Sequence, residues 1–358
     1  MHLGIRALLD FYRRHNQDDA LVLVTIIATE GSTYRKPGAM MLISPEGEYE
    51  GMISGGCLEG DLLQHADAVF ASGEAAFVTY DMHADDDLVW SLGLGCDGVI
   101  HLMLQRLGRE DDFGFLRQLE ASRAARKAAL LALVTRPESG LPCGSFALLD
   151  QAGAVTGAPQ LLHRLEAHTR PWPSWRTYPA RLDPAADQAD VLQINIPAAT
   201  RIMICGAGPD AVPLARALAE LDWDIVVVDH RPAFAKAGRF PPSCTVLRSR
   251  PERLGETADL SELDGVVIMS HHLDNDGEYL RQVSAYEIGY IGVLGPRARR
   301  DRLREMAACS DLEIHGPAGL DIGAELPSGI ALSIAAEIHA VLNRRNGLSL
   351  TARVDEES

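Results

Sequence analysis

Residues 201–229 read RIMICGAGPDAVPLARALAELDWDIVVVD, and this stretch decides the fold of the C-terminal half. An apolar strand is followed by a G-x-G-x-x-A turn at Gly206 and Gly208, a segment with helical spacing and a second strand. Glycines in this turn let a diphosphate approach the helix N-terminus, where free N–H groups favour anions. Asp229 ends the second strand and is placed to accept hydrogen bonds from ribose hydroxyls. The stretch predicts a Rossmann-type domain that binds a nucleotide, and the alternative is a Rossmann fold that packs without a ligand.

Further apolar runs continue this pattern downstream. CTVLR, GVVIMS and YIGVLG are separated from one another by helix-length stretches. Such alternation is typical of a doubly wound parallel sheet with helices on both faces. We assign residues 200–345 to this Rossmann-type domain and residues 346–358 to a tail.

Two segments of this half carry candidate site residues. His271 follows the run GVVIMS at the carboxyl edge of the predicted sheet, where ligands of open α/β folds bind, although it could equally hydrogen-bond a neighbouring loop. Asp276, a few residues later, is a candidate helix cap. Asp321 lies in GPAGLDIGA (316–324), which could shape one wall of a cleft or serve only to turn the chain.

The N-terminal half has a different pattern, in which short aliphatic runs alternate with Gly/Pro turns. This pattern is typical of a small β-rich unit. After SGGCLEG (54–60) the spacing becomes helical, so we expect a β-rich α+β domain over residues 1–165. Residues 166–199 are rich in Pro, Trp and Arg and are expected to connect the two domains, with one short strand, VLQINI, at the end of the connection.

A faint internal repeat lies within the N-terminal half. Gly38, Gly47 and Gly51 have the same relative spacing as Gly144, Gly153 and Gly157. This spacing predicts a duplicated hairpin whose second copy has a shorter first turn. Only the first copy is followed by the cysteine loop SGGCLEG.

Cys57 is the best candidate in the chain for a nucleophile or a soft-metal ligand. Ser54, Gly55 and Gly56 precede it, and the predicted helix begins directly after it. A helix N-terminus favours a thiolate, and the flanking glycines could expose it. Glu59 falls in the first turn of this helix, where an acidic residue is favoured. The alternative for Cys57 is a small buried packing residue, as most free cysteines are.

Two further loops supply weaker candidates. Cys96 lies in a second glycine-rich loop, GLGCDG (93–98). Arg35 and Lys36 form a turn with two adjacent cations, which could hold an anion or could be a solvated hairpin tip. The remaining cysteines are expected to be packing residues.

Composition excludes several classes of function. A formal charge of −17 over 358 residues gives a nucleic-acid backbone nothing to attract it, so we expect no nucleic-acid partner. The N-terminus does not have the pattern of a signal peptide, and no apolar run approaches the roughly 18 residues of a membrane span. The six cysteines include no C-x-x-C pair, which argues against a zinc finger. We expect a cytoplasmic protein with free thiols.

Several motifs together resemble the XdhC/CoxI family, in order and across nearly the whole chain. They are EGSTYRKPGAMMLI, SGGCLEGD, GLGCDG, the stretch from Gly206 to Ala235, MSHHLDND, YIGVLGPRARR and HGPAGLDIGAELP. The resemblance implies an accessory chaperone for xanthine dehydrogenase-type molybdenum hydroxylases. Such a chaperone binds the molybdenum cofactor, supports its sulfuration with a cysteine desulfurase and delivers it to the apo-enzyme.

The resemblance assigns roles to the candidate residues. Molybdenum needs a soft, exchangeable ligand, and the thiolate of Cys57 could supply one. The cofactor's phosphate, or the diphosphate of a dinucleotide form, would bind the turn from Gly206 to Gly208, so that one cofactor spans both domains. Homo-oligomer formation is also expected. The alternative is an NAD-dependent oxidoreductase of a small molecule, but no tyrosine has a lysine four positions later, so the Tyr-x-x-x-Lys pair of many dehydrogenases is absent.

Overall fold

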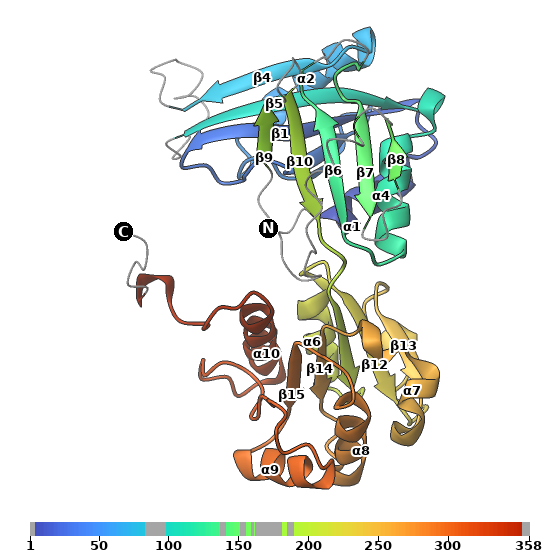
Figure 1. Cartoon of the computed structure of the whole chain (residues 1–358), viewed down its shortest axis with the longest axis vertical. Coiled ribbons are helices and arrows are strands. Elements are labelled where there is room, and N and C mark those ends of the chain that lie inside the picture. Colours follow the sequence, from blue (N-terminus) through green and yellow to red (C-terminus); the bar gives the residue numbers. More distant parts are fainter. Residues whose placement is uncertain are drawn as a thin grey trace. The chain divides into compact units, whose positions relative to one another are not determined.

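The computed structural model describes residues 4–82, 98–136, 141–150, 155–158, 161, 181–184 and 190–352. The chain forms two compact units, Met1–Ala198 and Ala199–Ser358, each built around its own sheets (Figure 1). Their boundary lies next to residue 200, where the sequence suggests that the Rossmann domain begins. In the described part of the chain, no helix combines the length and apolar character that a membrane span requires.

The first unit begins with a helix and an antiparallel five-stranded sheet. Its elements are α1 (Ile5–His15), β1 (Ala20–Gly31), β2 (Met40–Ile43), β3 (Tyr49–Gly51), α2 (Glu59–Ser72), β4 (Ala76–Asp81) and β5 (Gly98–Gly108). The strand order is β3-β2-β1-β5-β4. The first seven residues of β1 are buried, which explains why this strand is a continuous apolar run in the sequence.

A second five-stranded antiparallel sheet completes this unit. Its elements are η1 (Arg109–Asp111), α4 (Gly114–Ala124), β6 (Ala129–Val134), β7 (Phe146–Asp150), β8 (Val155–Gly157), β9 (Arg181–Pro184) and β10 (Asp190–Ile196). The strand order is β8-β7-β6-β10-β9, which matches the first sheet strand for strand. Because β9 and β10 belong to this sheet, residues 166–199 are not a connection throughout. β10 confirms the strand expected at VLQINI, and β9 is a second strand in this segment, which pairs with β10.

Backbone geometry confirms the predicted duplication. Gly51 and Gly157 have φ angles of 102° and 103°, and the N–H groups of Gly38 and Gly144 donate to the carbonyls of Ile26 and Val134, at 2.8 and 2.9 Å. Ile26 and Val134 are therefore equivalent positions. The segment between the paired residues is two residues shorter in the second copy, as the sequence suggests.

Two cores flank the first sheet. One lies between the two sheets, where Leu23 and Met103 of the first sheet pack with Leu131 of the second and with side chains of α1 and α4. The other lies beneath α2, where Leu62 packs against the opposite face of the first sheet. Alternate residues of each strand thus point into different cores.

The second unit is a parallel sheet of order β13-β12-β11-β14-β15. Its strands are β11 (Arg201–Cys205), β12 (Asp224–Asp229), β13 (Thr245–Arg248), β14 (Gly265–Ile268) and β15 (Tyr290–Val293). Its helices are α6 (Ala211–Ala219), α7 (Leu254–Thr257), α8 (Leu273–Val283), α9 (Arg297–Met306) and α10 (Pro327–Leu342), with short 3₁₀ turns at Ala237–Arg239, Pro251–Arg253, Leu260–Glu262 and Leu350–Ala352.

Helices cover both faces of this sheet, which confirms the doubly wound Rossmann class. Ile202 and Ile204 pack in one core with α6 and α10. Met203 and Cys205 pack in the other core with α8 and α9. The alternating burial along β11 is the reason that a parallel strand appears as an uninterrupted apolar run in the sequence.

Candidate functional site

Loops of the first sheet meet at one end of that sheet. β2 and β5 are antiparallel to β1, and β3 and β4 are antiparallel to β2 and β5 respectively, so β1, β3 and β4 all run in one direction. The turn over 32–39, the cysteine loop over 52–58 and the exit of β4 at Met82 therefore share this end. Cys96 lies outside the described residues, but Gly98, which follows its loop, accepts a hydrogen bond from the Met82 N–H at 3.1 Å.

The cysteine loop is organised by Ser54 and Glu59. The Glu59 carboxylate is 3% exposed and accepts hydrogen bonds from the N–H groups of Ile53, Ser54 and Leu58 and from the Ser54 hydroxyl, at 2.6–3.2 Å. The Ser54 hydroxyl oxygen in turn accepts from the N–H groups of Gly56, Cys57 and Leu58 at 3.1–3.3 Å. Glu59 therefore acts on the loop and is not aimed outward as an acid or base.

Glu59 keeps its negative charge although it is buried. Burial acts to raise the pKa of the Glu59 carboxyl, but the hydrogen bonds from Ser54 and from the loop amides outweigh it and leave this pKa below its ordinary value. An anionic carboxylate can accept from all four donors at once, which a neutral acid cannot do. The charge therefore fixes the loop conformation.

Cys57 lies on this fixed loop in a half-buried position. Its Sγ donates to the Ser54 hydroxyl oxygen at 3.4 Å, and the rest of the side chain packs against the core beneath α2. Within the described part of the chain, a Cβ added at Gly55, Gly56 or Gly60 would have no neighbour within 4 Å. Gly56 also has a φ angle of 109°, which disfavours any other residue there.

Arg35 and Lys36 belong to the turn at the same end of the sheet. Lys36 is exposed, and its Nζ donates to the Thr33 hydroxyl oxygen at 3.4 Å. Arg35 is half-buried, and burial lowers the pKa of its guanidinium. The turn is close to the start of β5, because a Cβ on Gly98 would stand 2.8 Å from the Ser32 carbonyl oxygen.

Close packing explains why the loop after β11 in the second unit has glycine at positions 206 and 208. Gly206 has a φ angle of 115°, and a Cβ there would stand 2.6 Å from the Met269 carbonyl oxygen. A Cβ on Gly208 would stand 2.6 Å from Asp210 Oδ1. Both glycines therefore allow close packing at the carboxyl edge of the sheet, as well as any approach of a phosphate. Pro209 has no N–H to offer an anion.

Asp229 is already engaged within this edge. It is 1% exposed, and its carboxylate accepts from the Ala207 N–H at 2.8 Å and from the Arg231 N–H, Nε and Nη2 at 2.7–2.9 Å. Burial acts to raise the pKa of Asp229, but these hydrogen bonds outweigh it and leave this pKa below its ordinary value. Asp229 thus ties the glycine loop to Arg231, and its contact with a ribose stays a prediction.

Two guanidinium groups flank Phe234 beside the glycine loop. Arg231 lies 4.1 Å and Arg239 5.1 Å from the centre of the ring. Arg239 also donates to the carbonyls of Ala207 and Phe234, at 2.7 and 2.8 Å. Because the charge of Arg231 is compensated by Asp229, the cation that favours an anion beside the N-terminus of α6 is Arg239.

His271 lies at the same edge, as the sequence predicts. Its side chain is 60% exposed, its φ angle is 63°, and its Nε2 lies 2.6 Å from Asp210 Oδ2. Asp276 does not cap α8, in contrast to the role considered from the sequence. It lies inside the helix, accepts hydrogen bonds from the N–H and hydroxyl of Ser270, and pairs with Arg299 at 2.7 Å. A buried carboxylate therefore holds the His271 loop much as Glu59 holds the cysteine loop.

Asp321 is exposed, on the loop that precedes α10. Sequence reasoning missed the group that shapes this loop. Glu337 Oε2 accepts from the Tyr290 hydroxyl at 2.6 Å and from the Gly319 N–H at 2.8 Å, and the Tyr290 ring stacks on His315. These residues are far apart in the chain, so only the fold could have revealed the group.

Comparisons with known proteins agree with both units. Residues 15–81 match the model of the XdhC and CoxI family, and residues 202–338 match the XdhC Rossmann domain. A Bacillus subtilis protein, named as a probable subunit of xanthine dehydrogenase, is 31% identical over 94% of this chain and 96% of its own length. The molybdenum cofactor insertion chaperone PaoD of Escherichia coli is 23% identical over 89% of this chain and 83% of its own.

A solved structure has the same arrangement of elements. A Bacillus halodurans protein described as a xanthine dehydrogenase superposes with a TM-score of 0.76 at 28% sequence identity, covering 98% of each chain.

Proposed function

Since the chain belongs to the XdhC and CoxI family, we propose that it is an accessory chaperone that binds the molybdenum cofactor and delivers it to a xanthine dehydrogenase-type hydroxylase. The observation that carries this proposal is the cysteine loop. It presents the Cys57 thiol on a backbone fixed by a buried charge, among glycines that leave the surface open. The similarity to PaoD supports the same cargo.

Cys57 is the proposed ligand for the metal end of the cargo. A thiolate is a soft ligand that exchanges, which suits a protein that must release what it binds. Ser54 and Glu59 position the loop, and the open surface over Gly55 and Gly56 accommodates the cofactor's ring system. Arg35 and Lys36, on the turn at the same sheet end, are placed to attract an anionic group.

The phosphate end of the cargo is proposed to bind the second unit at the Gly206–Gly208 loop. The positive N-terminus of α6 favours an anion, and Arg239, which donates to the Ala207 carbonyl of this loop, adds positive charge beside it. His271 and Asp321 are the further candidates for contacts in this unit. A monophosphate and a dinucleotide diphosphate would both bind this loop through its backbone N–H groups.

Transfer of the cargo requires partners. We propose a complex with the apo form of a molybdenum hydroxylase, and a second complex with a cysteine desulfurase that supports sulfuration of the cofactor. The names of the B. subtilis and E. coli relatives support the first of these partners. A pull-down of the hydroxylase apo-enzyme by the cofactor-loaded chain, but not by the cofactor-free chain, is the expected behaviour.

Metal and pterin analysis tests the proposal. The chain is expressed with molybdate and purified anaerobically as wild type, Cys57→Ala and Cys143→Ala. Cys143 is a matched control, because it is also a half-buried free cysteine of the first unit but lies in the turn equivalent to 32–39, away from any SGGCLEG loop. We expect molybdenum and pterin in the wild type and in Cys143→Ala, and a strong loss of molybdenum in Cys57→Ala. Absence of both molybdenum and pterin from the wild type would overturn the proposal.

A further inference from the structure

A histidine and three carboxylates meet in the first unit, where the end of α1 lies beside the turn between β2 and β3. His15 is the last residue of α1, and Asp18 follows it in the turn before β1. Glu46 and Glu48 belong to the turn between β2 and β3. One donor atom each of His15, Asp18 and Glu46 lies within 4.8 Å of the other two. Imidazole nitrogen and carboxylate oxygen together are ligands that suit a divalent metal ion.

The backbone on both sides of this group is held by the fold. The buried face of α1 packs in one core with residues of β1 and β2, which places the end of the helix beside the turn. The Asp18 N–H donates to the His15 carbonyl oxygen at 3.0 Å. In the turn, the Glu48 N–H donates to the Ser44 hydroxyl oxygen at 3.2 Å. The four side chains therefore start from fixed positions.

The imidazole of His15 lies between two of the carboxylates. Its Nδ1 lies 2.9 Å from Asp18 Oδ2, and its Nε2 lies 3.1 Å from Glu48 Oε2. The His15 side chain is 14% exposed, and its ring packs on the Phe11 ring with 4.3 Å between the centroids. A neutral imidazole has one N–H, so it can donate to only one of the two carboxylates. At the other nitrogen a lone pair faces an anionic oxygen, and a cation between these two atoms would stabilise the contact.

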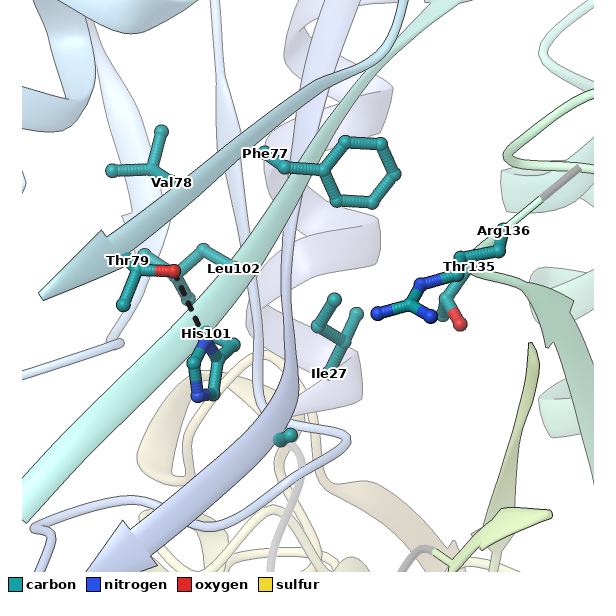
Figure 2. A pocket seen from close by; sticks show the side chains of 9 residues that line it. Ile27, Phe77, Val78, Thr79, His101, Leu102, Thr135 and Arg136 are labelled. Atoms are coloured by element: carbon teal, nitrogen blue, oxygen red, sulfur yellow. Dashed lines mark hydrogen bonds between the residues drawn. The ribbon is translucent and has the colours of Figure 1, made fainter. Parts of the chain in front are cut away.

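His101 shows how a histidine of the same unit avoids this conflict. Its Nδ1 lies 3.0 Å from the Thr79 hydroxyl, a group that can donate as well as accept (Figure 2). Its Nε2 lies 3.6 Å from a Glu30 carboxylate oxygen. A neutral ring can therefore satisfy both of its contacts at His101, whereas at His15 it cannot.

Glu46 favours a metal ion over a second proton on the His15 ring. A proton shared with Asp18 needs no further ligand, whereas a metal ion takes several, and Glu46 supplies a third donor atom. Neighbouring ligands of an octahedral ion with bonds of about 2.1 Å lie roughly 3 Å apart. The 2.9 Å between Nδ1 and the Asp18 oxygen matches this spacing. Glu48 then accepts from the Nε2–H, the outer contact that orients most metal-binding histidines.

The duplication indicates that the hairpin itself does not need these carboxylates. By the glycine spacing, Glu46 and Glu48 of the first copy correspond to Ala152 and Ala154 of the second. The equivalent strands nevertheless pair in both copies, β2 with β3 and β7 with β8. Within the described ranges, no lysine or arginine forms an ion pair with the three carboxylates around His15. Their mutual repulsion is a cost that a divalent cation would remove.

We propose that His15, Asp18 and Glu46 bind a divalent transition metal ion. The Glu48 carboxylate orients the imidazole, and the ion joins the end of α1 to the turn between β2 and β3. This site is separate from the cysteine loop, because the turn between β2 and β3 and the loop over 52–58 lie at opposite ends of β3. The proposal therefore does not depend on the cargo of Cys57.

Titration of the full chain with Mn²⁺, followed by the electron paramagnetic resonance signal of the free ion, tests this proposal. The chain is first treated with EDTA and carries Cys57→Ala, and Mn²⁺ prefers oxygen and nitrogen ligands to the remaining thiols. We expect saturable binding and a higher melting temperature with the ion than without it. Asp18→Asn and Glu46→Gln should each weaken binding at least about tenfold, since even an outer contact of a metal site is worth about that much.

Matched histidine variants make the result specific. His15→Gln should weaken Mn²⁺ binding as Asp18→Asn does. His65→Gln should leave it unchanged, although His65 also lies beside a carboxylate, with its Nε2 at 3.4 Å from Asp61 Oδ2. Mg²⁺ at the same concentration should compete poorly, because an imidazole ligand favours a transition metal ion.

Three outcomes would overturn the proposal. They are an absence of saturable Mn²⁺ binding in the parent chain, unchanged binding in both Asp18→Asn and Glu46→Gln, and displacement of Mn²⁺ by an equal concentration of Mg²⁺. Thermal melting in EDTA identifies any variant that fails to fold, so that a loss of binding is counted only for folded variants.

Discussion

At the scale of single residues, Glu59 does more for the cysteine loop than Cys57 itself does. Ile53 and Leu58 anchor the loop in the core beneath α2, and the backbone N–H groups between them converge on the Ser54 hydroxyl and the Glu59 carboxylate. A buried N–H group that loses its acceptor destabilises the fold by the full free energy of its desolvation. This penalty is larger than the net stabilisation that one hydrogen bond provides on folding. Glu59, in its ionised form, therefore stabilises this conformation of the loop.

We predict that Glu59→Gln lowers the free energy of unfolding by about 1–3 kcal/mol, because an amide offers one acceptor where the carboxylate offers two. Urea denaturation at neutral pH measures this change. The matched control is Glu74→Gln, an exposed residue just beyond α2, which should change stability by less than about 0.5 kcal/mol. If both variants lost the same free energy of unfolding, the conclusion that Glu59 positions the loop would be wrong.

Asp229 makes the stability of the second unit depend on pH in the acidic range. Its pKa is below the ordinary value in the folded chain, so the stability it contributes is complete above the unfolded pKa of about 4 and is lost as the pH falls through the lower folded value. We predict that the wild type loses stability over this acidic window, whereas Asp229→Asn is less stable at pH 7 and changes less with acid. Urea midpoints from pH 7 to pH 3 measure both curves, and parallel curves would contradict the prediction.

At the scale of elements, the duplication creates two equivalent positions, Gly51 and Gly157, at which only glycine fits. A Cβ on Gly51 would stand 2.4 Å from the Met40 carbonyl oxygen, and one on Gly157 would stand 2.2 Å from that of Phe146. In both sheets the third strand therefore ends in a residue with a positive φ angle and no room for a side chain.

We predict that Gly51→Ala and Gly157→Ala each destabilise the first unit by more than about 2 kcal/mol, because a left-handed backbone and a steric clash act together. Gly47 separates the two effects. It also has a positive φ angle of 81°, but a Cβ there would meet nothing within 4 Å, so Gly47→Ala should cost only about 1 kcal/mol. Chemical denaturation of the three variants gives the comparison. A cost at Gly47 as large as at Gly51 would show that the clash contributes nothing.

Sequence reasoning recovered the elements whose signals are local. The glycine spacing predicted the hairpins of both copies, and the strand-turn-helix pattern predicted the Rossmann sheet. It predicted the strand VLQINI, which is β10, but missed β9 and the place of both strands in the second sheet, since β10 joins that sheet by pairing with β6, far earlier in the chain. Cys57, Gly206 and His271 lie on loops, as expected. The carboxylates that hold these loops, Glu59 and Asp276, accept from residues at most six positions earlier in the chain, but the sequence analysis considered Glu59 for its place in the first helical turn and Asp276 as a helix cap, so it missed this role.

At the scale of the whole molecule, each unit has its own hydrophobic core. Among the described residues, the two cores of the parallel sheet are built from the second unit, and the cores around the antiparallel sheets are built from the first. A unit that buries its apolar surface against itself does not need its neighbour to fold. The functional consequence is that metal binding at Cys57 and anion binding at the glycine loop can be measured separately.

We predict that residues 199–358 fold as an isolated fragment. Trp223 is the only tryptophan of that fragment and is 2% exposed, so its emission reports the core around α6 and α10 directly. The fragment should melt cooperatively, with the blue-shifted emission of a buried indole before the transition. Because it lacks Cys57, it should carry no molybdenum when expressed with molybdate, while the full chain does. Emission typical of a solvated indole, or a melt without a cooperative transition, would mean that the second unit needs contacts from the first to fold.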